Sequence, residues 1–149
     1  MKPVKTWILV ADGARARIVV NEGPGKGVKQ LEGADFRAEH PSSGDVMADR
    51  PGRSFESSGS GRHAMEPTSD AHRLAKQAFV KEIAGFLQRQ AQKKSFDRLI
   101  ILAPPQALGD LRAALSDAVR TLVTAELAKD LTPVPNEDLA KHLSDVLAV

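Results

Sequence analysis

The chain has the length and composition of one folded domain. Its 149 residues are 42% hydrophobic and 27% charged, close to globular averages, so wholesale disorder is excluded. It contains no cysteine, which excludes disulfides, thiolate zinc sites and a cysteine nucleophile. A formal net charge of +2 permits contact with nucleic acid and argues only weakly for it.

Two strands joined by a tight turn are predicted near the amino terminus. Residues 7–10 form the continuous apolar run of a strand buried on both faces, and Asp12–Gly13 is a turn signal. Asp12 also interrupts the apolar run before any cleavage-site pattern, and no later stretch reaches the roughly 20 apolar residues of a membrane span. We therefore expect a cytoplasmic protein without membrane insertion.

The second strand of this hairpin carries the first group of candidate binding residues. Arg15 and Arg17 alternate with apolar residues and lie on the face opposite Ile18, next to Asp12 of the turn. Arginine binds phosphate bidentately, so this pair is a candidate anion site. The alternative is that both arginines are solvated strand residues. A third strand is predicted over 28–36, weakened by Gly33.

A long polar loop is predicted over about 37–70, where hydrophobic periodicity disappears. Loops longer than about 12–15 residues are uncommon in compact domains and are usually functional or disordered. A helix should follow it, with a cap oxygen from one of residues 68–70. The apolar stripe of this helix comprises Ala75, Phe79, Ile83, Phe86 and Leu87.

The rest of the chain alternates strands and helices. A buried strand in "RLIILAPP" ends at two prolines, and a helix over 108–123 directs Leu108, Leu111, Leu115, Val119 and Leu122 inward. Residues 124–135 are either a strand or a continuation of that helix, and a last helix begins with Asn136 as its cap. The predicted fold is a single α/β domain over 1–149, a mixed sheet flanked by helices.

The long loop holds the second group of candidate binding residues. Basic side chains stand among glycines that let a backbone approach a ligand closely: Arg50, Gly52, Arg53, Gly59, Gly61, Arg62 and His63. No phosphate-loop pattern follows a strand here, and acidic residues balance the arginines, so we expect local contacts rather than a uniform basic surface. The loop histidines lack metal-ligand spacing, and neither a metal nor a cofactor is predicted.

Four blocks of the sequence resemble a known bacterial family. They are "KTWILVADGARARI", "DRPGRSFESSGSGRHAMEPTSDAH", "FDRLIILAPPQALGDLRAAL" and "AELAKDLT". In this order they resemble the host attachment protein family, whose members are described as required for attachment to host cells. The resemblance covers nearly the whole chain. It implies a phenotype and specifies no biochemical activity.

A second, remote resemblance begins at "GSGRHAMEPTSDAHRLAKQAFVKEIA". This stretch is similar to the central domain of archaeo-eukaryotic peptide-chain release factors and Pelota, where a Gly-Gly-Gln tip precedes a long helix. Gly61 falls on the first glycine, Arg62 on the second and His63 on the glutamine. The resemblance implies a release-factor-like fold with an RNase H-like layout and a flexible tip before the long helix. Because Arg62 cannot freely adopt the conformations open to glycine, it does not extend to peptidyl-tRNA hydrolysis.

Three functions follow as hypotheses. The first is a non-enzymatic binding module that contacts structured RNA or the ribosome. The second is a protein–protein interaction module supporting attachment to host cells. The third is an ester hydrolase using the loop at 59–63, which is disfavoured because no nucleophile-and-base pair is visible. The sequence indicates no oligomeric state.

Overall fold

In the described part of the chain, five strands form one mixed sheet in the order β3-β2-β1-β4-β5. The computed structural model describes residues 3–38 and 61–147, with the backbone alone over 61–70. β1, β2 and β3 pair antiparallel, whereas β4 and β5 run parallel to β1. This confirms the predicted α/β fold with an RNase H-like layout. The strands are β1 (Thr6–Ala11), β2 (Arg15–Asn21), β3 (Lys29–Arg37), β4 (Arg98–Leu102) and β5 (Val123–Leu127).

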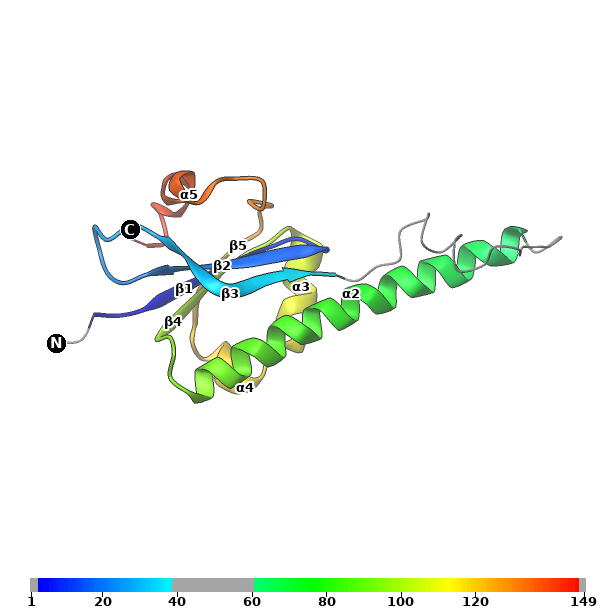
Figure 1. Cartoon of the computed structure of the whole chain (residues 1–149), viewed down its shortest axis with the longest axis horizontal. Helices are drawn as coiled ribbons and strands as arrows, with labels where there is room; N and C mark the ends of the chain where they lie inside the picture. Colours follow the sequence, from blue (N-terminus) through cyan, green and yellow to red (C-terminus); the bar gives the residue numbers. More distant parts are fainter. Residues whose placement is uncertain (1–2, 39–60, 148–149) are drawn as a thin grey trace.

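Helices cover both faces of this sheet (Figure 1). The long helix α2 (Gly61–Gln92) lies across one face together with α3 (Pro105–Ala114) and the short α4 (Asp117–Arg120). The other face is covered by α5 (Asn136–Leu143) and the segment that leads to it. No helix in residues 3–38 and 61–147 is long and apolar enough to cross a bilayer.

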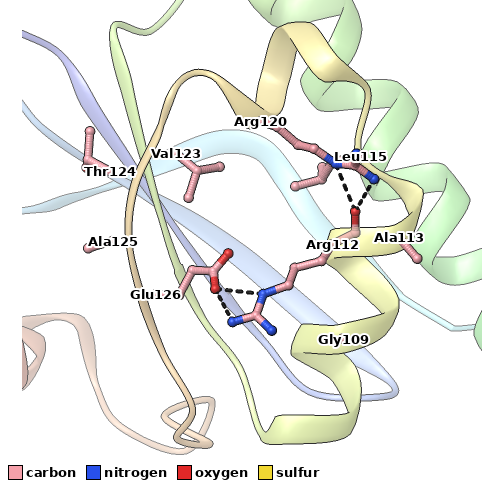
Figure 2. A pocket seen from close by; sticks show the side chains of 9 residues that line it. All are labelled: Gly109, Arg112, Ala113, Leu115, Arg120, Val123, Thr124, Ala125 and Glu126. Carbon is pink, nitrogen blue, oxygen red and sulfur yellow. Dashed lines mark hydrogen bonds and ion pairs between the residues drawn. The ribbon is translucent and has the colours of Figure 1, made fainter.

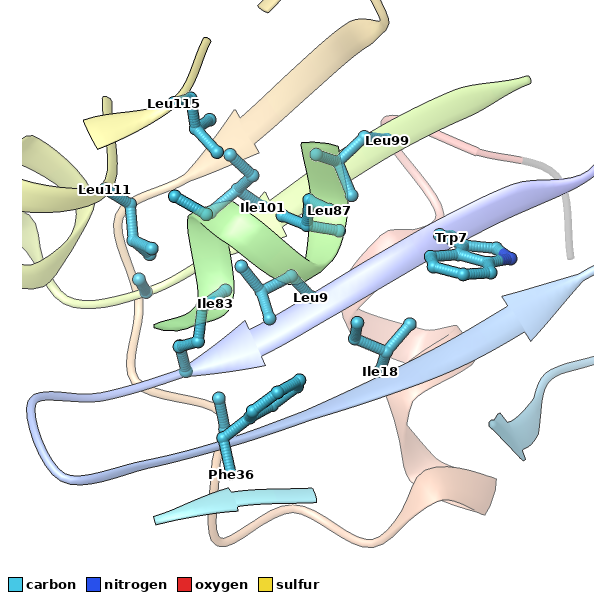
Figure 3. Close-up of a cluster of buried hydrophobic side chains, with 14 of the residues drawn as sticks. Trp7, Leu9, Ile18, Phe36, Ile83, Leu87, Leu99, Ile101, Leu111 and Leu115 are labelled. Atoms are coloured by element: carbon cyan, nitrogen blue, oxygen red, sulfur yellow. The ribbon is translucent and has the colours of Figure 1, made fainter. Parts of the chain in front are cut away.

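The central strands explain this layered arrangement. Every residue of β1 is buried, as its uninterrupted apolar run predicts, because both faces of the sheet are covered. On the α2 face, Trp7 stacks on Phe96 with ring centroids 4.7 Å apart and on Phe86 at 6.1 Å. Figure 3 shows the core on this face. Its labelled side chains are Trp7, Leu9, Ile18, Phe36, Ile83, Leu87, Leu99, Ile101, Leu111 and Leu115.

A local irregularity in β3 sets which side chains face one another at the sheet edge. Gly33 has φ of +76°, a conformation that favours glycine, and the β2–β3 register shifts between Arg17 and Val19. Beyond this shift, Arg15 lies directly opposite Arg37. The strand that the sequence predicts with a weakness at Gly33 is therefore present, and its irregularity determines the pairing at its end.

The predicted start of the long helix is wrong. α2 begins at Gly61, so residues 61–70 are helical and do not belong to the predicted loop over 37–70. The cap signals at Thr68 to Asp70 do not mark the start of the helix. The segment before them contains residues with high helix propensity, such as Ala64 and Glu66, and it is helical as well. Pro67 lacks an amide hydrogen and removes one helical hydrogen bond without ending the helix.

Two further differences concern the carboxyl-terminal half. The helix predicted over 108–123 is broken after Ala114: Leu115 is extended, and the Ser116 hydroxyl caps α4 by accepting from the Val119 amide. Residues 123–127 form a strand, which settles the alternative left open by the sequence. Asn136 is the first residue of α5 and not its cap, a position occupied by Pro135.

Candidate functional site

The loop residues predicted to bind divide into two sets. Arg50, Gly52, Arg53 and Gly59 lie outside the described residues. Gly61, Arg62 and His63 occupy the first turn of α2, so they do not form the tip of a flexible loop. The prediction of a flexible tip is therefore wrong for Gly61, Arg62 and His63, which belong to a helix.

The amino-terminal part of α2 projects beyond the sheet (Figure 1). The helix has 32 residues, so it is about 48 Å long at 1.5 Å per residue. Phe79 is the first buried residue along its described side chains, and most positions from 71 to 78 are exposed. These positions include Arg73 and Lys76. The projecting part of α2 thus presents cations beside the end of the sheet where β1 turns into β2.

The β1–β2 turn is fixed by Asp12. Its Oδ1 accepts from the amides of Ala14 at 2.7 Å and Arg15 at 2.8 Å, while the Asp12 amide donates to the Arg15 carbonyl at 2.9 Å. A Cβ added at Gly13 would lie 3.6 Å from Cε of Lys76. The Lys76 side chain therefore extends from α2 to the turn between β1 and β2.

Removal of the Asp12 charge should make stability less dependent on pH. Burial acts to raise the pKa of Asp12, but hydrogen bonds from the amides of Ala14 and Arg15 and from Thr132 outweigh it, so the pKa lies below its ordinary value of 3.8. The stabilisation is complete above about pH 5 and is lost as the pH falls through the lowered pKa. Urea unfolding at pH 7 and at pH 3 should show Asp12→Asn less stable than wild type at pH 7, with the difference shrinking at pH 3. A difference that is constant with pH would contradict this assignment.

Arg17 holds the segment before α5 against the sheet. Its Nε donates to Oδ1 of Asn136 at 2.8 Å, one terminal nitrogen donates to the Thr132 carbonyl at 2.9 Å, and the other donates to the Val134 carbonyl. Burial and the neighbouring charge of Arg15 lower its pKa below the ordinary value for arginine. Arg17 therefore acts mainly as a structural clamp, although the sequence predicts it as a binding residue.

Arg15 and Arg37 form a pair of like charges across β2 and β3. They are directly opposite each other in the register, and like charges in this position repel. The Arg15 side chain is 50% exposed and lies 3.5 Å from the Asp12 carboxylate. Arg37 is exposed, and no ion pair connects it to the described residues. Two arginines placed in this way favour an anion between or above them.

A small cavity adjoins this pair. It has a volume of about 260 Å³, and its charged lining comes from Arg15, Arg17, Asp35 and Arg37. We call Arg15, Arg17 and Arg37 the arginine corner. The sequence identifies its first two members by strand alternation. The place of Arg37 opposite Arg15 and that of Lys76 against the β1–β2 turn follow only from the β2–β3 register and the packing of α2. The described residues contain no cluster of histidine and carboxylate side chains that could bind a metal ion.

Comparisons with known proteins address the family and the fold. A family model described as "Protein required for attachment to host cells" matches residues 7–143. No curated protein matches the sequence significantly. Among solved structures, the crystal structure of an archaeal translation termination factor, aRF1, is similar with a TM-score of 0.53 and 10% identity. The similarity covers 96% of this chain and 35% of the archaeal protein, so the chain spans about a third of that structure's length.

Proposed function

Since the chain belongs to the family of proteins required for attachment to host cells and has a release-factor-like fold, we propose that it is a non-enzymatic binding module that contacts structured RNA in the translation machinery. The chemistry it recognises is the phosphate backbone. Its site is the arginine corner together with Lys76 at the base of the projecting α2. This activity would place the protein in the cytoplasm.

The observation that carries the proposal is the Arg15–Arg37 pair. Two guanidinium groups placed opposite each other do not stabilise an antiparallel sheet, because like charges repel. Asp12 already offsets part of the charge of Arg15, whereas no ion pair joins Arg37 to the described residues, so a phosphate would accept charge-assisted hydrogen bonds from Arg37 and from the exposed part of Arg15. Lys76 extends the positive charge from the sheet toward α2. The arginines lie at the same end of the sheet as Lys76 but on its α5 face, so a phosphate backbone would contact both by passing over this end of the sheet.

The name of the structural relative supports translation as the setting. The archaeal protein is a translation termination factor, and its fold is shared by nearly the whole of this chain. Catalysis is not included in the proposal. In the resemblance to release factors, Arg62 and His63 fall on the second glycine and the glutamine, and here they lie in the first turn of a helix. A glycine-dependent backbone geometry is therefore replaced by regular helical geometry at this point.

Co-sedimentation with ribosomes tests the proposal. The protein should pellet with ribosomes at low salt, and its binding constant should fall as salt rises, because phosphate contacts release counterions. A pull-down from lysate with and without nuclease separates RNA-dependent from protein-dependent association. Absence of ribosome and tRNA binding at low salt would contradict the proposal.

Neutralisation of Arg37 should weaken this binding and reduce its salt dependence. For Arg37→Gln, loss of one phosphate contact should lower the slope of log K against log salt by about 0.7–0.9. Lys26→Gln is the matched control, since Lys26 is an exposed cation in the β2–β3 turn at the opposite end of the sheet. Filter binding with tRNA measures both variants. Equal losses for the two would show that net charge, and not the arginine corner, determines affinity.

The family description favours a second candidate, a protein–protein module that supports attachment to host cells. This function predicts exposure of the native protein on the cell surface, where externally added protease would cleave it in intact cells. It also predicts partners that remain bound after nuclease treatment. Protection from external protease together with nuclease-sensitive association would favour the RNA-binding function.

A further inference from the structure

The indole N–H of Trp7 donates to no acceptor among the described residues, although Trp7 is only 4% exposed. Stacking on Phe96 and Phe86 holds the ring and therefore fixes the direction of the N–H. In Figure 3 the indole nitrogen lies at the end of the ring turned away from the other labelled core side chains. Buried tryptophans usually donate to a partner, because an unsatisfied buried donor destabilises the folded state. A molecule that binds beside Trp7 would supply the acceptor.

A cavity of about 430 Å³ adjoins this ring, between β3 and the carboxyl-terminal part of α2. We call it the Trp7 cavity. Its apolar lining comes from Trp7, Val20, Leu31 and Phe86, of which Leu31 and Phe86 are only partly buried. Small-molecule sites have volumes of about 300–1,000 Å³ and are mostly apolar, with a few polar groups that orient the ligand. The Trp7 cavity has this size and an aromatic wall against which a planar ring can stack.

The lining also includes four charged side chains whose charges cancel. Lys5 and Lys29 are positive, and Glu22 and Glu32 are negative. No ion pair joins any of the four to the described residues. They can therefore donate hydrogen bonds to a ligand and accept hydrogen bonds from it. Because the lining has no net charge, it suits a neutral ligand better than an anion.

The charged residues of a larger cavity, between β5 and the helices α3 and α4, already have partners (Figure 2). This cavity has a volume of about 950 Å³. Arg112 donates to the Glu126 carboxylate, and Arg120 donates to the Arg112 carbonyl at 2.7 Å and pairs with Asp117 at 3.5 Å. Its volume alone does not indicate a ligand. The smaller Trp7 cavity is the better candidate because a buried donor without an acceptor adjoins it.

We propose that the Trp7 cavity binds a nucleobase, either of a free nucleoside or of an unpaired nucleotide in RNA. A nucleobase is planar and neutral, and it carries both acceptors and N–H donors on its edges. Its ring stacks on the aromatic wall, and a carbonyl oxygen or ring nitrogen accepts from the Trp7 N–H. Its own N–H groups donate to Glu22 or Glu32.

This site is separate from the arginine corner. Trp7 pairs with Val20 at the β2–β3 end of the strands, whereas Arg15 and Arg37 pair at the other end. Binding of a free nucleoside is therefore independent of the proposed contact with the phosphate backbone. Capture of an RNA nucleotide would rest on that function. Loss of ribosome binding with retained nucleoside binding would contradict the proposed function and leave this inference intact.

The indole N–H resonance of Trp7, the single tryptophan of the chain, reports binding directly. Titration of the full-length protein with adenosine or uridine should shift this resonance and slow the exchange of its proton with water. Trp7→Phe retains an aromatic ring but removes the N–H, so affinity measured by calorimetry should fall by at least about tenfold. An unstructured RNA oligonucleotide provides the second arm: a shift with the oligonucleotide alone identifies RNA as the source of the base.

A second variant, Leu31→Trp, keeps the proposal testable if Trp7→Phe fails to fold. Leu31 is partly buried on an edge strand, where an aromatic residue is tolerated, and the larger side chain should fill the cavity and abolish binding. Absence of any shift at millimolar nucleoside and with the oligonucleotide would overturn the proposal. So would equal affinity for free phenylalanine, or nucleoside binding that neither variant weakens.

Discussion

Replacing Phe79 with alanine should destabilise the protein by about 3–5 kcal/mol, the usual cost of truncating a buried aromatic side chain. Phe79 is 2% exposed, and it is the first buried residue along the described side chains of α2. It lies in the core cluster that joins α2 to the sheet. Its loss leaves a cavity at the point where the projecting part of the helix leaves the body of the protein.

Urea unfolding measures this effect through the fluorescence of Trp7, the single tryptophan of the chain. Leu74→Ala is the control. Leu74 lies on the same helix with 60% exposure, so its truncation should change stability by no more than about 0.5 kcal/mol. A similar loss for both variants would show that α2 does not depend on the buried contact at Phe79.

Replacing Arg17 with methionine should cost about 2–3 kcal/mol. Methionine retains much of the apolar stem but removes every donor, which leaves the carbonyls of Thr132 and Val134 and Oδ1 of Asn136 without the hydrogen bonds they accept from Arg17 in the native protein. Because the clamp holds the segment before α5, hydrogen exchange should also accelerate across residues 132–143.

Arg15→Met provides the matched comparison for this prediction. Arg15 precedes Arg17 by two residues on the same face of β2, but its side chain is half exposed and its Thr132 contact is long, at 3.5 Å. Its replacement should cost less than about 1 kcal/mol and should leave exchange near α5 unchanged. Equal destabilisation by the two variants would contradict the structural role assigned to Arg17.

The sequence predicts the sheet well because its strands carry strong local patterns. The apolar runs of β1 and β4 and the alternation in β2 are sufficient to place these strands. The break between α3 and α4 is less visible. Leu115 and Val119 keep the apolar spacing of one continuous helix and both are buried, although Ser116 between them carries a cap signal that the structure uses.

The site is only partly predictable for a different reason. Arg15 and Arg17 follow from strand alternation, but alternation assigns them the same role. Tertiary contacts separate them: Arg17 bonds to a segment more than 110 residues away in sequence, whereas Arg15 faces Arg37 across the sheet. Arg37 ends a strand whose register depends on the irregularity at Gly33. Local sequence does not specify that register.

Ultraviolet crosslinking of the protein to ribosomes, with identification of the crosslinked peptides, tests the RNA-binding proposal most directly. The proposed function predicts crosslinks at the arginine corner and along the part of α2 that includes Lys76, with loss of the corner crosslinks in Arg37→Gln. Crosslinks confined to the β2–β3 turn or to the β5 edge, or none at low salt, would contradict it.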